Sequence, residues 1–457
     1  MKLNYKRTVY VGFAFFLICA FWQAYDTIIP LTLTNKFGLS QTASGVVMAL
    51  DNILALFLLP LFGAISDRHR SRFGKRTPFI FAGTVISVLA FMGLSFVDNW
   101  QRANLIELTG SSEPQTMIAF ATAATENSPL VLIIFIAILL LILLSMATFR
   151  SPAVALMPDV TIKPLRSKAN AVINLMGTAG GILVLALGIV FATSKEENAT
   201  MSYTPYFLAV ALIMVFALAM FLWKVREPQF AEQMRLDSQK YGIDESESAE
   251  EGDRKLSKSE KRSLFFLLAS IILWFMAYNA VTSKYSVYAT NILKKDYNLT
   301  LIIAQAAAVI SYLPVGMIAS RIGRKKAILA GVVLLTTAFT VAAFVREDSP
   351  DFWMYAMFIL AGIGLASINV NSFPMVVEMC KGSDVGKYTG IYYTASMTAQ
   401  TLTPLLSGYL MDQFGMTVLF PYAAVFSAIA FVTMLFVLHG DNRPTAKHGL
   451  EALDIED

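Results

Sequence analysis

Long apolar runs recur from one end of the sequence to the other, and they limit the folds that are open to it. A run of about 20 apolar residues, wound as a helix, spans the roughly 30 Å hydrocarbon core of a membrane. Only 15% of the residues are charged, whereas soluble domains carry about 25%. Hydropathy predicts twelve spans, at residues 8–33, 42–66, 77–97, 129–157, 168–193, 204–224, 263–290, 299–320, 325–345, 353–378, 384–410 and 417–439. We therefore predict an all-α membrane protein with twelve transmembrane helices.

The first apolar run follows a basic start, MKLNYKRTVY, of the kind that opens a signal peptide. It continues past Phe21 and contains Asp26, and no cleavage site of small residues closes it. We expect this run to be retained as the first helix. The two cysteines and three histidines show no metal-ligand spacing, so we predict no metal site.

The connections between the spans alternate in charge. Lys and Arg are concentrated in one set, residues 67–76, 159–168, 225–262, 321–326 and 381–387. The other set holds fewer, mostly balanced by acids: residues 34–41, 98–128, 194–203, 291–298, 346–352 and 411–416. The positive-inside rule places the first set and both termini in the cytoplasm. We expect a monomer that crosses the cell membrane many times.

The most charged short connection lies within Gly63–Ile80, GAISDRHRSRFGKRTPFI. A shorter copy of it, GMIASRIGRK, stands at residues 316–325 after the eighth span, with Ser320 in place of Asp67. This repeat predicts two related six-helix bundles around a central path. The expected divisions are an N-terminal bundle at 1–224, a flexible linker at 225–262, a C-terminal bundle at 263–440 and a cytoplasmic tail at 441–457.

Together these features resemble the major facilitator superfamily, whose members carry G-x-x-x-D-R…G-[KR]-[KR] after the second helix. The longer form in this chain, SDRHRSRFGKRTPFI, resembles the glycoside–cation symporters and most of all their sucrose/proton symporter-like branch. Arg150–Asp159 and Asn369–Pro374 fit that branch too. The resemblance implies a secondary active transporter that imports a glycoside or oligosaccharide with protons, by alternating access.

In this superfamily the basic loop latches the cytoplasmic side, so the resemblance implies a gate. Its expected members are Gly63, Asp67, Arg68, Gly74, Lys75, Arg76, Asp159, Arg321 and Glu378. Asp67 is expected near the start of the eleventh helix at Ser383–Asp384, where the helix dipole favours an anion. Arg68 is expected to reach Asp159, and Arg321 to reach Glu378. The alternative is that these residues only anchor the topology.

Four charged residues fall inside predicted spans: Asp26, Asp51, Arg150 and Lys284. A charge at depth costs about 2.5–3.5 kcal/mol on insertion scales and usually faces a cavity or a partner. Asp26 and Lys284 lie at similar depth in equivalent helices, and we expect them to face each other directly or through substrate. Alternatively, Lys284 snorkels to the outer interface and Asp26 caps locally. Arg150 is expected near Asp51 or Asp26, or else in a structural ion pair.

Neutral polar side chains in the spans suit a hydroxylated ligand, because sugar sites combine amide hydrogen bonds with aromatic faces. The expected set is Gln23, Asn279, Tyr285, Tyr288, Asn369, Asn371 and Gln400. The alternative for the tyrosines is helix packing or the interface belt. Protons are favoured over sodium, because the second span has Ala55 and Leu59 where sodium-coupled members of the resembled family carry acids.

Other functions remain open or are excluded. A proton antiporter that exports drugs or lipids is the main alternative, and a non-transporting membrane sensor is the next. The sequence contains no G-x-x-x-x-G-K-[ST] nucleotide-binding motif, and no Ser/His/Asp arrangement. We therefore expect no enzyme activity, no cofactor and no nucleic-acid partner.

Overall fold

The computed structural model describes residues 2–241, 256–379 and 385–440, and within them it contains helices and no strand. Eleven helices in these ranges are long and apolar enough to cross a membrane. They overlap eleven of the twelve predicted spans, although the helix Thr77–Thr109 runs well past the predicted end at residue 97 into the predicted connection 98–128. The twelfth is α14 (Val385–Phe414), which is 30 residues long but carries five threonines and an acid, Asp412. The prediction of an all-α membrane protein is confirmed.

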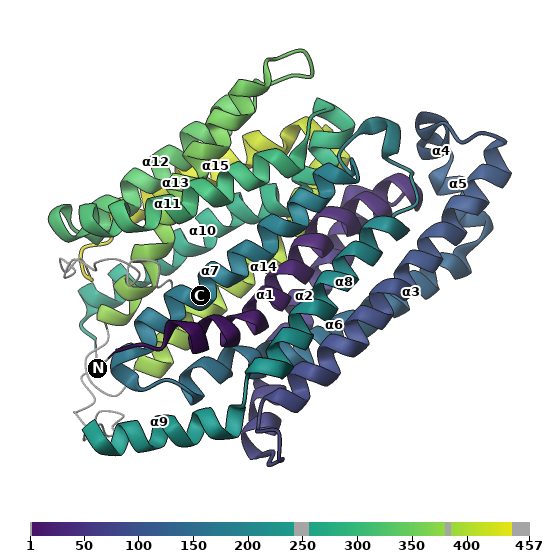
Figure 1. Cartoon of the computed structure of the whole chain (residues 1–457). Helices are drawn as coiled ribbons and strands as arrows, with labels where there is room; N and C mark the ends of the chain where they lie inside the picture. The colour runs from purple at the N-terminus through teal and green to yellow at the C-terminus, as the bar shows by residue number, and fades with distance from the viewer. Residues whose placement is uncertain (1, 242–255, 380–384, 441–457) are drawn as a thin grey trace. The chain divides into compact units, whose positions relative to one another are not determined.

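The chain divides into two compact units, and Figure 1 colours it along its length. The first unit contains Met1–Ile243 and also Ser286–Leu299. The second contains Asp244–Tyr285 and Thr300–Asp457. The segment Ser286–Leu299 thus packs with the first unit although it connects two helices that lie largely in the second.

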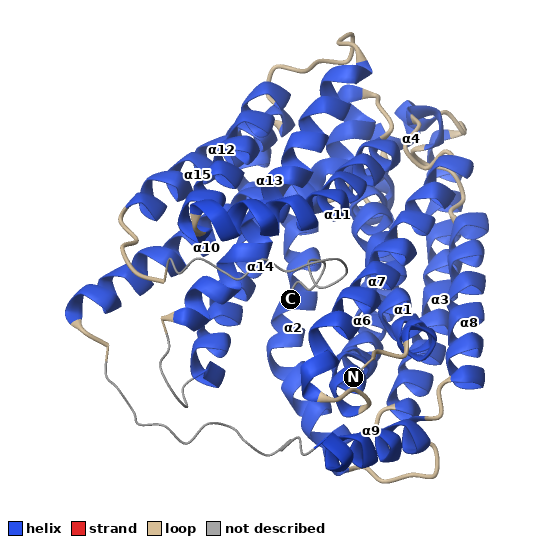
Figure 2. Ribbon diagram, turned by 60° about the vertical axis from the view of Figure 1, so that its left-hand side comes forward, coloured by secondary structure: helices blue, strands red, loops and turns tan. Residues whose placement is uncertain are grey.

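Seven helices of 15 residues or more build the first unit: α1 (Tyr5–Leu31), α2 (Gln41–Arg68), α3 (Thr77–Thr109), α6 (Pro129–Asp159), α7 (Arg166–Val190), α8 (Thr204–Lys224) and α9 (Glu227–Tyr241). Short helices α4 (Pro114–Ala119) and α5 (Ala121–Asn127) follow α3. Figures 1 and 2 show α9 and the start of α1 at one end of this unit, with α4 at the opposite end. These are the ends that the charge pattern assigns to the cytoplasm and to the outside.

Close helix contacts at small residues hold the first unit together. A side chain at Gly180 of α7 would collide with the carbonyl oxygen of Phe16 in α1, and one at Gly177 with the sulfur of Cys19. Aromatic rings fill the rest of the core, among them Phe91, whose centroid lies 4.4 Å from that of Phe207. Small residues permit this backbone approach, which supplies dispersion contacts where lipid removes the hydrophobic driving force.

The second unit is built from α10 (Lys258–Tyr288), α11 (Tyr297–Ile322), α12 (Arg324–Ala342), α13 (Asp351–Glu378), α14 and α15 (Leu419–Leu435). Helix α12 packs against α13 and α15. At its contact with α13, Gly331 and Gly364 each lie against the carbonyl oxygen of the other. Glycine is required there because a side chain on either residue would separate the two backbones.

The two copies of the basic connection share a backbone feature. Gly74, before α3, has a φ of 112°, and Gly323, before α12, has a φ of 95°. This region of φ is open mainly to glycine. The predicted repeat therefore includes a matching turn in each half, although the side chains around it have diverged.

The segment 225–262, which the sequence predicts to be a flexible linker, begins with a helix. Helix α9 occupies Glu227–Tyr241, and Arg7 of α1 holds it by donating to the carbonyl of Phe230 at 2.8 Å. The same guanidinium donates to the carbonyl of Val160 at 2.6 Å. The start of this segment is thus a folded part of the first unit, while residues 242–255 lie outside the described ranges.

Candidate functional site

Two acids and one arginine of the first unit interact within the apolar bundle. Asp26 belongs to α1, Asp51 to α2 and Arg150 to α6, and the charge of Asp26 interacts with both of the others. Asp51 also accepts a hydrogen bond from the amide of Asn52 at 2.8 Å. All three charged side chains are partly exposed. The structure therefore brings together three of the four intramembrane charges that the sequence identifies.

An aromatic pair on α1 borders this charged group. The guanidinium of Arg150 lies 5.7 Å from the ring centroid of Trp22, and the rings of Trp22 and Tyr25 meet edge to face at 5.2 Å. The indole nitrogen and the tyrosine hydroxyl are both buried without a hydrogen-bond partner in the described part of the chain. Sequence reasoning omitted Trp22 from the site. Trp22 stands four residues before Asp26 and so lies on the same face of the helix, which is the sequence pattern that could have identified it.

The fourth intramembrane charge lies in the second unit. Lys284 of α10 has no exposed surface, which argues against the alternative in which it snorkels to the outer interface. Its charge interacts with that of Asp412 in α14. Asp26 and Lys284 belong to different units, and their pairing stays a prediction.

The predicted amides differ in how well their hydrogen bonds are satisfied. Buried atoms of Asn279 and Asn369 have no partner among the described residues. Asn371 instead donates to a backbone carbonyl one turn earlier at 2.9 Å, and Gln400 donates to a serine hydroxyl at 3.2 Å. Gln23 is partly exposed on α1. Because an unsatisfied buried polar group costs about 1–3 kcal/mol, Asn279 and Asn369 are the amides with most to gain from a polar ligand.

The two predicted tyrosines of α10 are buried. Tyr285 and Tyr288 are 0% and 1% exposed. The hydroxyl of Thr300 donates to that of Tyr285 at 2.8 Å, and the Tyr285 ring centroid lies 4.5 Å from that of Phe358. For Tyr285 this geometry matches the alternative of helix packing.

Arg76 is the centre of the basic loop. Its Nε donates to Asp159 at 2.8 Å, and its terminal nitrogens bind Asp67 and the hydroxyl of Ser66. The expectation that Arg68 reaches Asp159 is wrong, because Arg76 occupies that carboxylate and Arg68 is exposed. Burial alone would lower the pKa of Arg76, but the hydrogen bond and charge of Asp159, and then those of Asp67, raise it above its ordinary value.

Glu227 of α9 fixes the backbone on which Arg76 stands. Its carboxylate accepts hydrogen bonds from the backbone amides of Lys75 at 2.6 Å, Arg76 at 2.9 Å and Thr77 at 2.8 Å. The carboxylate also fills the space beside Gly74 that a side chain there would occupy. Sequence reasoning missed Glu227. Glu followed by Pro, three residues after the predicted span that ends at Lys224, was the available signal of a new helix start.

The other predicted gate residues make fewer side-chain contacts than Arg76 in the described part of the chain. Gly63 lies where a side chain would meet the hydroxyl of Ser151 in α6, and the Lys75 side chain is exposed. In the second copy Arg321 is exposed, whereas Lys325 donates to two carbonyls at the end of α15, at 3.0 and 2.6 Å. The side chain of Glu378 and residues Ser383–Asp384 lie outside the described part, so their predicted contacts stay predictions.

A family model described as Major Facilitator Superfamily matches residues 11–304 and 285–453 of the chain. Solved transporters share the fold. The xylose transporter XylE from E. coli, in an inward open conformation, has a TM-score of 0.66 at 16% identity and covers 97% of this chain and 98% of its own. The nucleoside transporter NupG has a TM-score of 0.55 at 14% identity, covering 95% of this chain and 98% of its own.

Curated relatives match in part. Sucrose transport protein SUC3 of Arabidopsis thaliana is 29% identical over 154 residues, or 34% of this chain. Proton-associated sugar transporter A of Homo sapiens is 33% identical over 110 residues, or 24% of this chain. The matches span only 24% of the plant protein and 14% of the human protein.

Proposed function

The chain belongs to the Major Facilitator Superfamily, and from that premise we propose that it imports a glycoside or oligosaccharide together with a proton by alternating access. Substrate binds near mid-membrane, as is usual for transporters built from repeated halves. The membrane it works in is the cell membrane, and it works as a monomer. The basic loop around Arg76 closes the cytoplasmic side.

The observation that carries this proposal is the group formed by Asp26, Asp51 and Arg150. With both acids ionised the group has two negative charges and one positive charge, a net charge of −1. One proton makes the group neutral, and a neutral group is less costly to enclose in a low-dielectric bundle. Proton binding therefore favours occlusion of the site, which is the coupling that a symporter needs.

The surroundings of this group favour a sugar as substrate. Trp22 offers an aromatic face and, with Tyr25, two polar atoms without partners among the described residues. Sugar sites combine such faces with carboxylate and amide hydrogen bonds. The printed names of two partial relatives, a sucrose transport protein and a proton-associated sugar transporter, point the same way. We also propose Lys284, Asn279 and Asn369 as substrate-binding residues.

Uptake by the purified protein in liposomes tests the proposal. Vesicles with an acidic exterior are given a panel of radiolabelled disaccharides, with and without a protonophore. We expect accumulation of at least one sugar that depends on the pH gradient, and an inward proton flux when that sugar is added. Sugar efflux driven by proton entry, or no response to any sugar in vesicles that transport a lipophilic cation, would contradict it.

A further inference from the structure

Helices α1 and α10 each end in a single π-helical turn. The first is η1 (Thr32–Lys36) and the second is η4 (Ala289–Leu293). In each, the residue after the turn donates its amide hydrogen to the carbonyl five residues earlier. Such turns are rare and are frequently found at functional sites. Both contain the dipeptide Thr–Asn, at 34–35 and at 290–291.

The two asparagines of these turns bind each other. Asn291 donates its side-chain amide to the oxygen of Asn35 at 2.8 Å, and Asn35 donates to the oxygen of Asn291 at 3.3 Å. The Asn35 side chain is almost fully buried, at 1% exposed. A reciprocal pair of this kind requires an amide on both sides, since each group must both donate and accept.

The chain after η4 makes further polar contacts with the residues that follow α7. The hydroxyl of Ser194 donates to Asp296 at 2.8 Å. Thr193 lies 2.8 Å from the hydroxyl of Tyr297 and accepts from the amide of Asn298 at 3.2 Å. We call the Asn35–Asn291 pair together with these contacts the outer clasp. All of the contacting groups are polar, so water can take the place of each partner if the groups separate.

Backbone strain is concentrated at the same place. Among the described residues, the non-glycine residues with positive φ are Ala192, at 53°, and Lys294, at 52°. Ala192 directly precedes the Thr193–Ser194 side of the clasp, and Lys294 directly follows η4. Lys294 also forms an ion pair of 3.1 Å with Glu196. Residues in sparsely populated backbone conformations cluster at clamps and switch regions.

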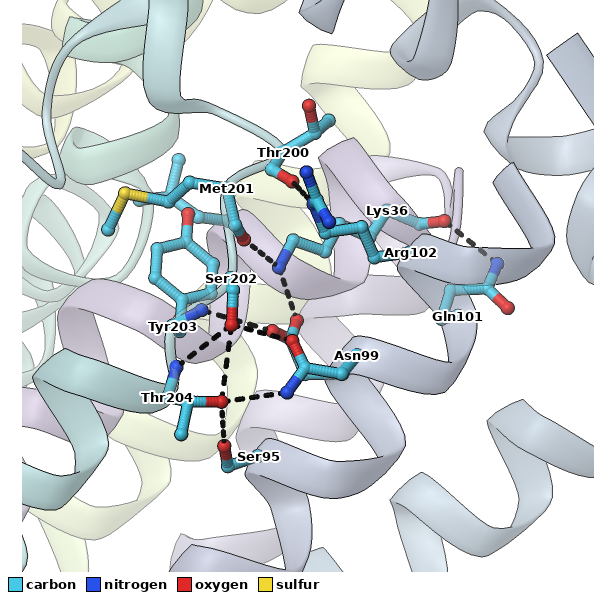
Figure 3. A network of polar contacts seen from close by, with 12 residues as sticks. Lys36, Ser95, Asn99, Gln101, Arg102, Thr200, Met201, Ser202, Tyr203 and Thr204 are labelled. Carbon is cyan, nitrogen blue, oxygen red and sulfur yellow. Dashed lines mark hydrogen bonds and ion pairs between the residues drawn. The ribbon is translucent and has the colours of Figure 1, made fainter. Parts of the chain in front are cut away.

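The η1 side of the clasp lies beside a network of polar contacts around Lys36, drawn in Figure 3. Lys36, next to Asn35, forms a 2.5 Å ion pair with Asp98, and neither side chain is exposed. Its ammonium also donates to the carbonyl of Met201 at 2.6 Å, and Gln101 donates to the Lys36 carbonyl at 2.9 Å. These contacts surround the residue next to Asn35 with polar partners on both its side chain and its backbone.

We propose that the outer clasp is a releasable contact that holds the outer face of this transporter shut, and that the Asn35–Asn291 pair must part before a substrate enters from outside. This proposal rests on the proposed function, transport by alternating access, only for the reason that the outer face must open. The contact and its release are measured without any substrate.

The test is the rate at which a buried cysteine in η4 becomes labelled from outside. Thr290 has no exposed surface, and Thr290→Cys is introduced after Cys19 and Cys380 are replaced by serine. A membrane-impermeant maleimide is applied to the full-length protein in membranes. We expect Asn35→Ala and Asn291→Ala each to accelerate labelling about tenfold, the factor expected for loss of two neutral hydrogen bonds. The double variant should go no further than either single variant, because both break the same pair.

Asn127→Ala, at an exposed outer residue, is the matched control and should leave the labelling rate unchanged. A second measurement does not depend on the folding of the alanine variants. In Asn35→Cys/Asn291→Cys, oxidation should join two fragments produced by a protease site inserted at residues 242–255, and a reductant should separate them. If labelling were unchanged in both alanine variants, or if the fragments never became joined, the proposed clasp would be wrong. Either result would leave the sugar uptake experiment unaffected.

Discussion

The carboxylate of Glu227, the first residue of α9, accepts hydrogen bonds from both the backbone amide and the hydroxyl of Thr77, the first residue of α3, each at 2.8 Å. An acid at the start of a helix satisfies free amides and complements the helix dipole. Here the acid comes from another helix 150 positions further along the chain. The linker helix is therefore a structural component of the basic loop.

Loss of this contact should loosen the loop without unfolding the bundle. In Glu227→Ala, we expect the backbone amides of Lys75, Arg76 and Thr77 to exchange hydrogen about ten- to a hundredfold faster, because each loses a bond to a charged acceptor worth roughly 1.5–3 kcal/mol. Hydrogen–deuterium exchange read by mass spectrometry measures this. Glu232→Ala, on the exposed face of the same helix, is the control. Equal exchange in the two variants would mean that Glu227 does not order the loop.

Arg76 and Arg68 should differ sharply in their effect on transport. Arg76→Gln leaves Asp67 and Asp159 without their shared partner, and we expect initial uptake to fall about tenfold or more, given charge-assisted hydrogen bonds of roughly 1.5–3 kcal/mol. Arg68→Gln removes an exposed charge and should change uptake less than about twofold. Initial rates in vesicles with matched protein content decide this. If uptake fell by similar factors in both variants, transport would depend on the positive charge of the whole loop and not on the specific contacts of Arg76.

Asp26→Asn and Asp51→Asn should each separate sugar movement from proton movement. Each variant has one ionisable acid fewer in the group with Arg150, so we expect accumulation driven by a pH gradient to be lost. Exchange of labelled for unlabelled sugar at equal pH should persist where the amide still binds substrate. Asp348→Asn, in an exposed outer connection, is the control. Full gradient-driven accumulation in either site variant would remove that acid from the coupling role.

The buried pair of Lys36 and Asp98 should behave as one unit in stability. Lys36→Met leaves a buried carboxylate uncompensated and is expected to destabilise the protein by about 3–5 kcal/mol. Lys36→Met/Asp98→Asn should recover a large part of that loss, because no lone charge remains. Unfolding of the protein in detergent measures both, and Arg235→Met, which breaks an exposed pair, should leave stability unchanged. A double variant no more stable than Lys36→Met alone would show that the unpaired carboxylate of Asp98 is not the cause of the loss.

The helices could be predicted from the sequence because hydropathy directly reports the cost of placing backbone and side chains in lipid. Helix α9 could not be predicted in the same way. It is polar, it lies at an aqueous end, and its stability comes from contacts with Arg7 and with the amides of Lys75 and Thr77, which are distant in the sequence. Only its Glu–Pro start was visible beforehand.

The sequence predicted which residue types form the candidate site, but it predicted less well which side chains bind each other. Intramembrane charge identified Asp26, Asp51 and Arg150 because each is costly without a partner. The choice of Arg76 over Arg68 depends on the turn at Gly74, which directs the chain back toward α2 and α6. The π-helical turns that contain Asn35 and Asn291 depend on tertiary contacts. The Thr–Asn dipeptide that both turns contain was the only sign of them in the sequence.

The separation of Lys36 from Asp98 in the chain has a consequence for how the protein is made. The two residues are 62 positions apart, and synthesis proceeds at about 5–20 residues per second. For about 3 to 12 seconds the ribosome has produced the lysine but not its partner. During that time the buried ion pair cannot form, so the contact that joins the outer end of α1 to α3 is made only after α3 has been synthesised. The buried contacts of Lys36 are complete only once Asp98 of α3 and Met201, just before α8, have both been synthesised.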